Sequence, residues 1–274
     1  MKISIITPVY NGSNYIKDTI ESVISQTALL DGSVQLQYIV IDGSSVDNTV
    51  EIVKSYADDR FVIVSESDEG MYDALAKGLM LVDGDVVGYI NAGDLMNREA
   101  FSVARDVFKL PNVDWITGIP CFINESNQII GSRQTFRYKR KLIRSGVYGY
   151  SLPFIQQEST FWRKYLNNSI SYADLRCYKL AGDAYIWHCF AHFADLYFVD
   201  SFLAAFKIHD GQLSANKKKY RDEMLKFGVR RFNRFWLVLL EGFFWISPAF
   251  LRKYLSRTST IYYSVTSSCW NIRI

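Results

Sequence analysis

Residues 65–94 read SESDEGMYDALAKGLMLVDGDVVGYINAGD, so an acidic turn, an apolar helical pattern and a short apolar run follow one another. The spacing predicts a helix over residues 71–82 and, after a turn, a buried strand over residues 86–90. The strand stops at a small, acid-bearing turn, residues 91–94. Such a turn is typical of an open α/β sheet, which binds ligands in a crevice at its carboxyl edge. Asp94 therefore stands where Mg²⁺ or Mn²⁺, which prefer oxygen ligands, would be held against a phosphate group.

The chain before this stretch repeats the same alternation of strand and helix. Strands are predicted over residues 2–7, 35–41 and 61–64, because β-branched residues are dense there, and helical spacing follows each of the first two. Strands that alternate with helices form βαβ units with right-handed crossovers, so the sheet should be mainly parallel. The polar strand ends at Pro8, Asp42 and the 91–94 turn would then gather at one edge of the sheet. No GxGxxG follows the first strand, so a dinucleotide-binding site is not supported.

Composition excludes several classes of protein. The chain has 274 residues, of which 49% are hydrophobic, so it can bury a full core. The net charge of +3 argues against a dedicated nucleic-acid-binding protein. The four cysteines form no CxxC pair, which is typical of a reducing compartment and of neither a zinc site nor a disulfide framework. The chain opens with a strand pattern rather than a signal peptide, and no run of about 18 apolar residues predicts a transmembrane helix.

Four segments carry a family resemblance: IITPVYNG at residues 5–12, VIDGSSVDNT at residues 40–49, SESDEGMYDALAKG at residues 65–78 and YINAGD at residues 89–94. In this order and spacing they resemble the family 2 glycosyltransferases, which have the GT-A fold. The resemblance is strong over residues 1–120, weaker to about residue 215 and absent beyond it. It implies an α/β fold with a Rossmann-like, mainly parallel central sheet flanked by helices.

The resemblance also implies a division of the chain. Residues 1–214 would form the GT-A domain, with a nucleotide-sugar half at residues 1–120 and an acceptor half at residues 121–214. Residues 215–274 are predicted to be a basic, aromatic-rich helical extension.

A nucleotide-sugar donor site built from the turns is what the resemblance implies next. Tyr10 would stack on the base, and Asp42, an acceptor-only carboxylate, would accept a hydrogen bond from the imide of uracil. Asp68 would add to the base and ribose pocket. Asp73 lies in the first turn of the predicted helix, where an acid also favours the helix dipole, so its presence has a second explanation. Lys77 would touch the diphosphate or merely face solvent. The predicted donor-binding residues are Pro8, Tyr10, Asp42, Asp68, Asp73, Lys77, Asn91 and Gly93.

The metal site implied by the resemblance depends on Asp94, the last acid of the family's DxD element. Asp94 should bind the Mn²⁺ or Mg²⁺ that bridges the donor diphosphate. Gly93 stands where the usual middle acid would be, so one certain carboxylate ligand remains, which predicts weak, donor-dependent metal binding. His209, after a late strand, is a second candidate ligand, and the alternative is a turn histidine bonded to the backbone.

Residues 153–164 and 180–187 resemble the acceptor-side segments of the family, although Gln156 stands where the family usually has histidine. Gln157, Glu158 and Trp187 are predicted to line the acceptor and sugar pocket. Transfer with inversion needs a general base that takes the proton of the acceptor hydroxyl. Asp183 is the predicted base, with Glu158 as the second choice. An N-cap of the following helix is the alternative for Asp183.

Two basic, aromatic-rich segments predict contact with anionic phosphates. Residues 133–141 read RQTFRYKRK, which favours a lipid or acceptor phosphate over nucleic acid because the rest of the chain lacks matching charge. A solvated helix face is the alternative. Residues 217–236 interleave Lys and Arg with aromatic residues before a short apolar run. This pattern is typical of an interfacial amphipathic helix, and the alternative is a helix pair packed on the domain or on a second subunit.

Together these patterns predict an inverting, divalent-metal-dependent hexosyltransferase. It would move a sugar from a UDP-sugar to a hydroxyl of a polyprenyl-diphosphate-linked glycan in bacterial surface polysaccharide biosynthesis, such as that of O-antigen. The expected location is cytoplasmic and peripheral, at the inner face of the cell membrane. A nucleotidyltransferase is disfavoured because residues 8–12 contain no Lys or Arg. A non-catalytic glycan- or membrane-binding protein of GT-A descent is disfavoured because Asp94 and Asp183 are both present.

Overall fold

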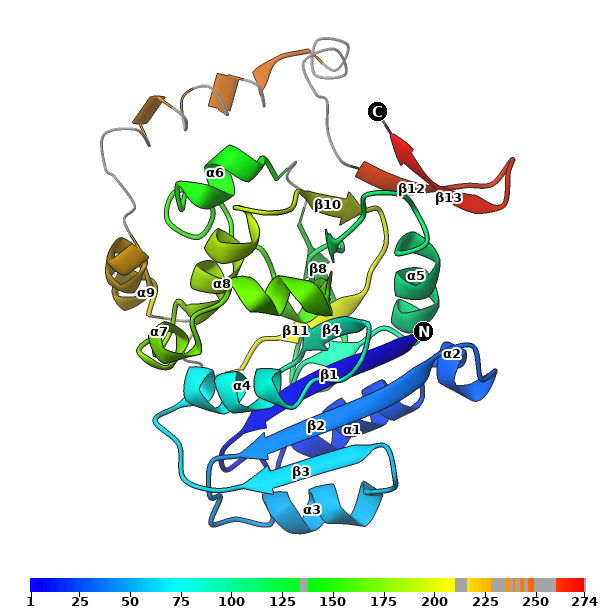
Figure 1. Cartoon of the computed structure of the whole chain (residues 1–274), viewed down its shortest axis with the longest axis vertical. Helices are drawn as coiled ribbons and strands as arrows, with labels where there is room; N and C mark the ends of the chain where they lie inside the picture. Colours follow the sequence, from blue (N-terminus) through cyan, green and yellow to red (C-terminus); the bar gives the residue numbers. More distant parts are fainter. Residues whose placement is uncertain are drawn as a thin grey trace.

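The computed structural model of the chain describes residues 1–133, 138–209, 216–227, 235–236, 239, 242–243, 246–248 and 260–273. These residues form two sheets, and helices cover both faces of the larger sheet (Figure 1). Within this described part, no helix has both the length and the apolar character needed to cross a lipid bilayer.

The larger sheet contains nine strands among the described residues, and parallel pairing dominates it. In sheet order they are β13 (Cys269–Arg273), β12 (Thr260–Ser264), β10 (Leu196–Val199), β6 (Trp115–Thr117), β9 (Thr160–Arg163), β4 (Val86–Tyr89), β1 (Lys2–Val9), β2 (Gln35–Asp42) and β3 (Phe61–Ser65). The pairs β4-β1, β1-β2 and β2-β3 are parallel, so their carboxyl ends share one edge of the sheet. β9 is antiparallel to both β4 and β6, and β13 is antiparallel to β12.

A smaller sheet crosses the edge where the 91–94 turn lies. Its strands, in order, are β5 (Leu95–Met96), β11 (Ala204–Lys207), β7 (Cys121–Ile123) and β8 (Ile129–Ser132). β5 follows Asp94 directly and pairs antiparallel with β11, while β7 and β8 form a hairpin. This sheet therefore brings a late part of the chain, β11, beside the turn that ends β4.

Helices cover the larger sheet on both sides. The α-helices are α1 (Ile16–Ile24), α2 (Thr27–Leu30), α3 (Thr49–Tyr56), α4 (Met71–Met80), α5 (Ala100–Val107), α6 (Arg140–Arg144), α7 (Tyr172–Arg176), α8 (Gly182–Phe190) and α9 (Lys217–Met224). Short 3₁₀ turns are η1 (Gln157–Ser159), η2 (Lys164–Ser169) and η4 (Leu225–Phe227). α1, α3 and α5 pack on one face, and α4 and α8 pack on the other (Figure 1).

The core divides into two layers because the sheet is covered on both faces. Side chains alternate along β1, so Ile3 and Ile5 join the layer under α1 and α5, while Ile6 joins the layer under α4. Three tryptophans, Trp115, Trp162 and Trp187, fill the second layer. α4 lies so close to β1 that a Cβ on Gly78 would come within 2.5 Å of Ile6 Cγ2.

The predicted fold class is confirmed, with small differences at element ends. The helix predicted over residues 71–82 spans Met71–Met80, and the strand predicted over 86–90 spans Val86–Tyr89. The basic segment 133–141 is only partly described, because residues 134–137 lie outside the described residues, and it leads into α6.

The prediction of a helical extension over residues 215–274 is confirmed for α9 and wrong for residues 260–273. Those residues form the β12–β13 hairpin, and β12 extends the larger sheet in parallel with β10. The physical reason is composition, because TIYYS and CWNIR are rich in β-branched and aromatic residues, which favour strands. Ile261 on β12 is fully buried in the layer under α5.

Ile261→Ala should therefore destabilise the protein. Removing a fully buried isoleucine side chain typically lowers the free energy of unfolding by about 2–5 kcal/mol, since the cavity is only partly refilled. Val265→Ala is the control, because Val265 directly follows the end of β12 and is 84% exposed, so its change should stay within about 0.5 kcal/mol. Chemical denaturation of both variants measures the difference, and equal stability would contradict the pairing of β12 with the core.

Candidate active site

The shared edge of the parallel strands collects the polar turns. β2 ends at Asp42, and β4 is followed by the turn of residues 91–94. The turn after β1 is tied to the turn after β2, because the Asn11 amide donates to Ser45 Oγ (2.7 Å) and the Val46 amide donates to Asn11 Oδ1 (3.0 Å). The sheet thus brings the predicted donor-side turns together, as its topology requires.

Asp94 is buried between the two sheets, with 4% of its surface exposed. Its Oδ1 accepts the backbone N–H of Lys207 on β11 (2.9 Å), and its Oδ2 accepts Nε2 of Gln157 (3.3 Å). Burial raises the pKa of Asp94 to about 7, against the opposing effect of these hydrogen bonds. Asp94 is therefore poised between its charged and neutral forms near neutral pH.

Three more buried oxygens near this turn lack a hydrogen-bond partner among the described residues: Asn91 Oδ1, Gln157 Oε1 and Glu158 Oε1. Oxygens of carboxylates and amides are the donors that Mg²⁺ and Mn²⁺ prefer, so the residues around Asp94 fit such a cation by type. Within the described ranges, no three His, Cys, Asp or Glu side chains converge as a ready-made metal cluster. The donor set is consistent with a cation that needs ligands from a bound molecule as well.

The candidate base-recognition residue Asp68 lies against Gly43, the residue that follows Asp42. Asp42 is buried and accepts hydrogen bonds from Ser65 Oγ (2.6 Å) and from the Ser45 amide (3.1 Å). A Cβ on Gly43 would come within 2.6 Å of Asp68 Oδ2, so a side chain at Gly43 would push Asp68 away. Tyr10, in contrast, is 64% exposed, so its ring face is accessible to a ligand.

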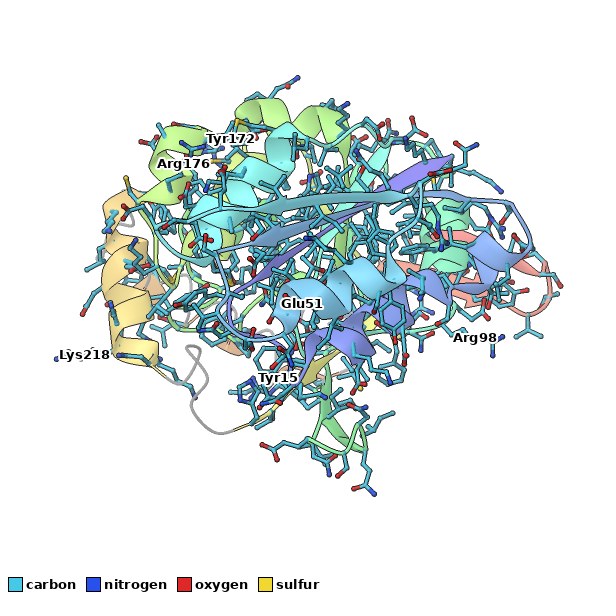
Figure 2. The ribbon with its side chains drawn as sticks, turned by 90° about the horizontal axis from the view of Figure 1, so that it is seen from below. Tyr15, Glu51, Arg98, Tyr172, Arg176 and Lys218 are labelled. Carbon is cyan, nitrogen blue, oxygen red and sulfur yellow. The ribbon has the colours of Figure 1, made fainter. Side chains whose placement is uncertain are left out.

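Asp73 and Lys77 take part in ion pairs that shape the turn before α4. Asp73 pairs with Nε of Arg176 (3.1 Å) and accepts the Glu69 amide (3.0 Å). Lys77 pairs with Glu66 (2.9 Å) and donates to the Ser67 carbonyl (2.9 Å). Figure 2 shows Arg176 on α7 beside α4. These contacts give both side chains a structural explanation, and a donor-binding role for them stays a prediction.

Asp183 lies in the first turn of α8, buried against two tyrosines. Its Oδ1 accepts the hydroxyl of Tyr220 on α9 (2.8 Å) and that of Tyr72 on α4 (3.4 Å). Burial raises the pKa of Asp183 to about 6, while the bonds from Tyr220 and Tyr72 act in the opposite direction. Asp183 is therefore mainly ionised at neutral pH.

Glu158, in η1, is also buried and lies within electrostatic range of both Asp94 and Asp183. Burial first, and then the charges of Asp94 and Asp183, raise the pKa of Glu158 well above its usual range. The candidate acids therefore form one buried group, in which each negative charge makes the next less favourable.

The remaining predicted residues take different positions. Pro8 lies near the buried end of β1, and Gly93 has φ +110°, a conformation that disfavours a side chain. Trp187 is buried in the tryptophan cluster, stacked on Trp115 with ring centroids 5.5 Å apart. His209 stacks on Tyr15 at 5.0 Å. Roles for these side chains in ligand or metal binding stay predictions.

Sequence reasoning missed three residues of this site: Tyr72, Lys207 and Tyr220. Tyr72 packs directly on Gly182, because a Cβ on Gly182 would come within 2.4 Å of its ring. Lys207 is 2% exposed, and its Nζ lies 3.7 Å from Asp18 Oδ2. A lysine at the end of an otherwise apolar strand was the available signal for Lys207. Tyr220 gave no signal, because it sits in a segment that reads as a basic surface helix.

Comparison with known proteins identifies the family. The sequence model of Glycosyl transferase family 2 matches residues 4–175, more than half of the chain. The chain belongs to this family.

Relatives of known sequence point the same way. An uncharacterized glycosyltransferase of Rickettsia typhi is 25% identical over 213 residues, which cover 77% of this chain and 65% of that one. The poly-β-1,6-N-acetyl-D-glucosamine synthase of Staphylococcus epidermidis is 34% identical over 140 residues, covering 50% of this chain and 32% of the synthase. The chain therefore spans less than two thirds of the length of either relative.

Solved structures confirm the GT-A fold. Residues 1–349 of Staphylococcus aureus TarS in complex with UDP match with a TM-score of 0.58 at 16% identity, covering 93% of this chain and 78% of that one. A mannosyltransferase from Pyrobaculum calidifontis in complex with GDP-Man and Mn²⁺ matches with a TM-score of 0.57 at 16% identity, covering 82% and 62%. At this identity the likeness concerns the fold alone.

The raised pKa of Asp183 predicts a pH-dependent stability. A carboxyl whose folded pKa lies above its unfolded value binds protons more tightly when folded, so its contribution to stability falls as pH rises from about 4 through 6. Asp183→Asn removes this pH-dependent loss of stability, and its amide oxygen can still accept the hydrogen bond from Tyr220. Relative to the wild type, the variant should gain on the order of 2–3 kcal/mol between pH 4 and pH 7.

Asp47→Asn is the control of opposite sign. Burial acts to raise the pKa of Asp47, but bonds from Thr49 and Ser13 lower it to about 2. That variant should lose stability relative to the wild type above about pH 4. Denaturant unfolding at a series of pH values measures both, and parallel curves for wild type and Asp183→Asn would contradict the burial of the charge.

Proposed function

We propose that this chain is an inverting glycosyltransferase that moves a sugar from a UDP-sugar to a hydroxyl of a glycan acceptor. The observation that carries the proposal is the buried acid group Asp94, Glu158 and Asp183, in which Asp94 follows β4 at the same edge of the parallel sheet where β2 ends at Asp42. This arrangement within a family 2 chain supports a donor site and a general base at one edge of the sheet.

The donor nucleotide would bind at the turns after β1, β2 and β3. Asp42 already accepts two hydrogen bonds, and a carboxylate has about four acceptor sites, so it retains capacity for an imide N–H of uracil. The exposed ring of Tyr10 supplies a flat face for stacking. The UDP complex of TarS and the sugar nucleotide in its companion structure support this class of donor by analogy of fold.

Asp94 would hold the divalent cation, with Asn91, Gln157 and His209 as further candidate donors. When bound, the cation would offset the charge that develops on the departing diphosphate. Gln157 orients the Asp94 carboxylate from one side, and the backbone of β11 orients it from the other.

Asp183 would act as the general base, and the ionisation states favour it over Glu158. A base with a pKa of about 6 is mostly ionised at neutral pH and still accepts a proton readily. The pKa of Glu158 is raised well above its usual range, so Glu158 tends to keep its proton. The proton of the acceptor hydroxyl would pass to Asp183 as that oxygen forms its bond to the anomeric carbon and the bond to the nucleotide breaks.

A lipid-linked acceptor and a peripheral place at the inner face of the cell membrane complete the proposal. Lys217, Lys218 and Lys219 are exposed on α9, and Figure 2 shows Lys218 pointing away from the molecule. Phe235, Trp236 and Phe243 are also exposed. Cationic and aromatic side chains in one segment suit a surface of anionic lipids, where a polyprenyl-diphosphate-linked glycan would reside.

A pair of variants separates the donor site from the base. Asp94→Ala should abolish transfer and Mn²⁺-dependent binding of UDP, because the carboxylate at the diphosphate is lost. Asp183→Asn should lower transfer by about 10²–10⁴-fold, the usual worth of a general base, while UDP affinity stays unchanged. Calorimetry with UDP and Mn²⁺ and a transfer assay over a set of UDP-sugars measure the two effects. Loss of UDP affinity in Asp183→Asn, or an active Asp94→Ala, would contradict the assignment.

The membrane proposal is tested with surface changes in the full chain. Phe235→Ser with Trp236→Ser should reduce co-flotation with anionic liposomes, and Lys218→Glu with Lys219→Glu should reduce it further at low salt, where each basic residue contributes roughly 1 kcal/mol. Phe193→Ser with Tyr165→Ser is the matched control, since both are exposed aromatic residues elsewhere. Wild-type flotation should weaken as ionic strength rises. A wild type that ignores liposomes at every salt concentration favours packing of this segment on protein.

A further inference from the structure

α9 packs on the start of α8. In the sequence the two helices are separated by a stretch that includes residues 210–215, which are outside the described residues. Met224 is fully buried in the layer under α4 and α8, and Glu223 is nearly so. The Tyr220 ring packs edge-on against Phe154, with centroids 4.8 Å apart. α9 is thus part of the packed core rather than a separate arm.

Glu223 binds the backbone that leads into α8. Its carboxylate accepts the amides of Lys179 (3.1 Å), Leu180 (2.8 Å) and Ala181 (3.0 Å). Three charge-assisted bonds to consecutive amides immobilise this segment, which directly precedes Gly182 and Asp183. A negative charge at this end of α8 also complements the helix dipole.

Tyr220, one turn earlier on α9, binds the candidate base itself. Its hydroxyl donates to Asp183 Oδ1 at 2.8 Å, a normal hydrogen-bond length. On the other side Tyr72 donates to the Leu180 carbonyl (3.0 Å) and approaches the same Oδ1 at 3.4 Å. Both phenols bond to Oδ1, and a backbone hydrogen bond from Ala184 also favours the charged carboxylate.

We propose that Tyr220 is a positioning residue for the candidate base, and that Glu223 fixes the backbone so that α9 holds the Asp183 carboxylate in a single orientation. The inference rests on the proposed function in one respect, the assignment of Asp183 as the base. It assigns a role in the reaction to a segment beyond residue 175, where the match to the family model ends.

The electrostatics of Asp183 give this role a measurable signature. The groups that face Asp183 are Tyr72 on α4, Tyr89 on β4, Glu158 in η1 and Tyr220 on α9. The Tyr220 hydroxyl donates to the ionised carboxylate and so lowers the pKa of Asp183 against the effect of burial. Removing that hydroxyl should raise the pKa, and the base would then be protonated over a wider range of pH.

The deciding experiment titrates Asp183 directly in the full chain. Proteins labelled with ¹³C at the aspartate carboxyl carbons are followed by NMR against pH, and the Asp183 signal is assigned by its loss in Asp183→Asn. Tyr220→Phe should raise the Asp183 midpoint by about one pH unit, which is about a tenfold change in proton affinity. Tyr178→Phe is the control, because Tyr178 stacks on Tyr185 of α8 without a bond to Asp183, and its midpoint should equal that of the wild type.

Glu223→Gln provides a second, independent test. An amide offers a single acceptor oxygen and no charge, so the hydrogen bonds to the amides of residues 179–181 should weaken. The hydrogen bond from Tyr220 to Asp183 should weaken as a consequence. The Asp183 midpoint should rise in this variant too, but by less than in Tyr220→Phe, because loss of the Glu223 charge acts in the opposite direction. An unchanged midpoint in Tyr220→Phe with an unchanged melting temperature overturns the proposal. If Tyr220→Phe does not fold, Glu223→Asp takes its place, because it keeps the charge but shortens the side chain, and an unchanged midpoint there overturns the proposal.

A kinetic experiment distinguishes a failure of this inference from a failure of the proposed function. With UDP-GlcNAc as the probe, and UDP release as the readout, Tyr220→Phe should lower kcat near pH 6 several-fold, recover at higher pH and leave the donor KM unchanged. A wild type that releases no UDP from any UDP-sugar counts against the proposed function, and the titration still decides the role of Tyr220. A loss of kcat that is equal at every pH, with an unshifted midpoint, contradicts positioning by this hydrogen bond.

Discussion

The bond from the Lys207 backbone to the buried carboxylate of Asp94 joins the two sheets at the point where the site forms. An ionised carboxyl in such a place is costly unless it is hydrogen-bonded, so the turn after β4 needs a donor from elsewhere in the chain. β11 provides it, and the pairing of β5 with β11 fixes the distance. Gln157, which also binds Asp94, ties η1 to the same point. Three segments distant in sequence are thereby held around one acid.

Burying several acids together separates their ionisation states. Asp183 has two phenols that favour its charged form, whereas Glu158 Oε1 has no hydrogen-bond partner among the described residues, and both neighbouring charges oppose its ionisation. Two carboxyl groups with similar ordinary pKa values thus reach different protonation states because their surroundings differ. This difference favours Asp183 as a base, and it depends on α9 as much as on α8.

Sequence patterns predicted the parts of the fold that depend on residues close together in the sequence. The alternation of strand and helix predicted the parallel strands around β1, and the polar residues at the strand ends predicted where Asp42 and Asp94 would lie. The contact between Tyr220 and Asp183 could not be predicted, because the two residues are 37 positions apart. A basic helix also has the same sequence pattern whether it packs on the protein or faces solvent. The β12–β13 hairpin was missed for a related reason. The basic and aromatic residues at positions 217–236 favoured a helix, and that prediction was extended to the whole of residues 215–274.

The two halves of the site follow different rules of assembly. The turns proposed to bind the donor come from the first 94 residues and follow neighbouring parallel strands, so their geometry follows from the sheet itself. The base side is assembled from η1, α8 and α9, whose placement depends on tertiary packing. Tyr72 links the halves, because it belongs to α4 on the donor side yet bonds the Leu180 carbonyl beside the base. A change at Gly182 would displace Tyr72 and so disturb both sides.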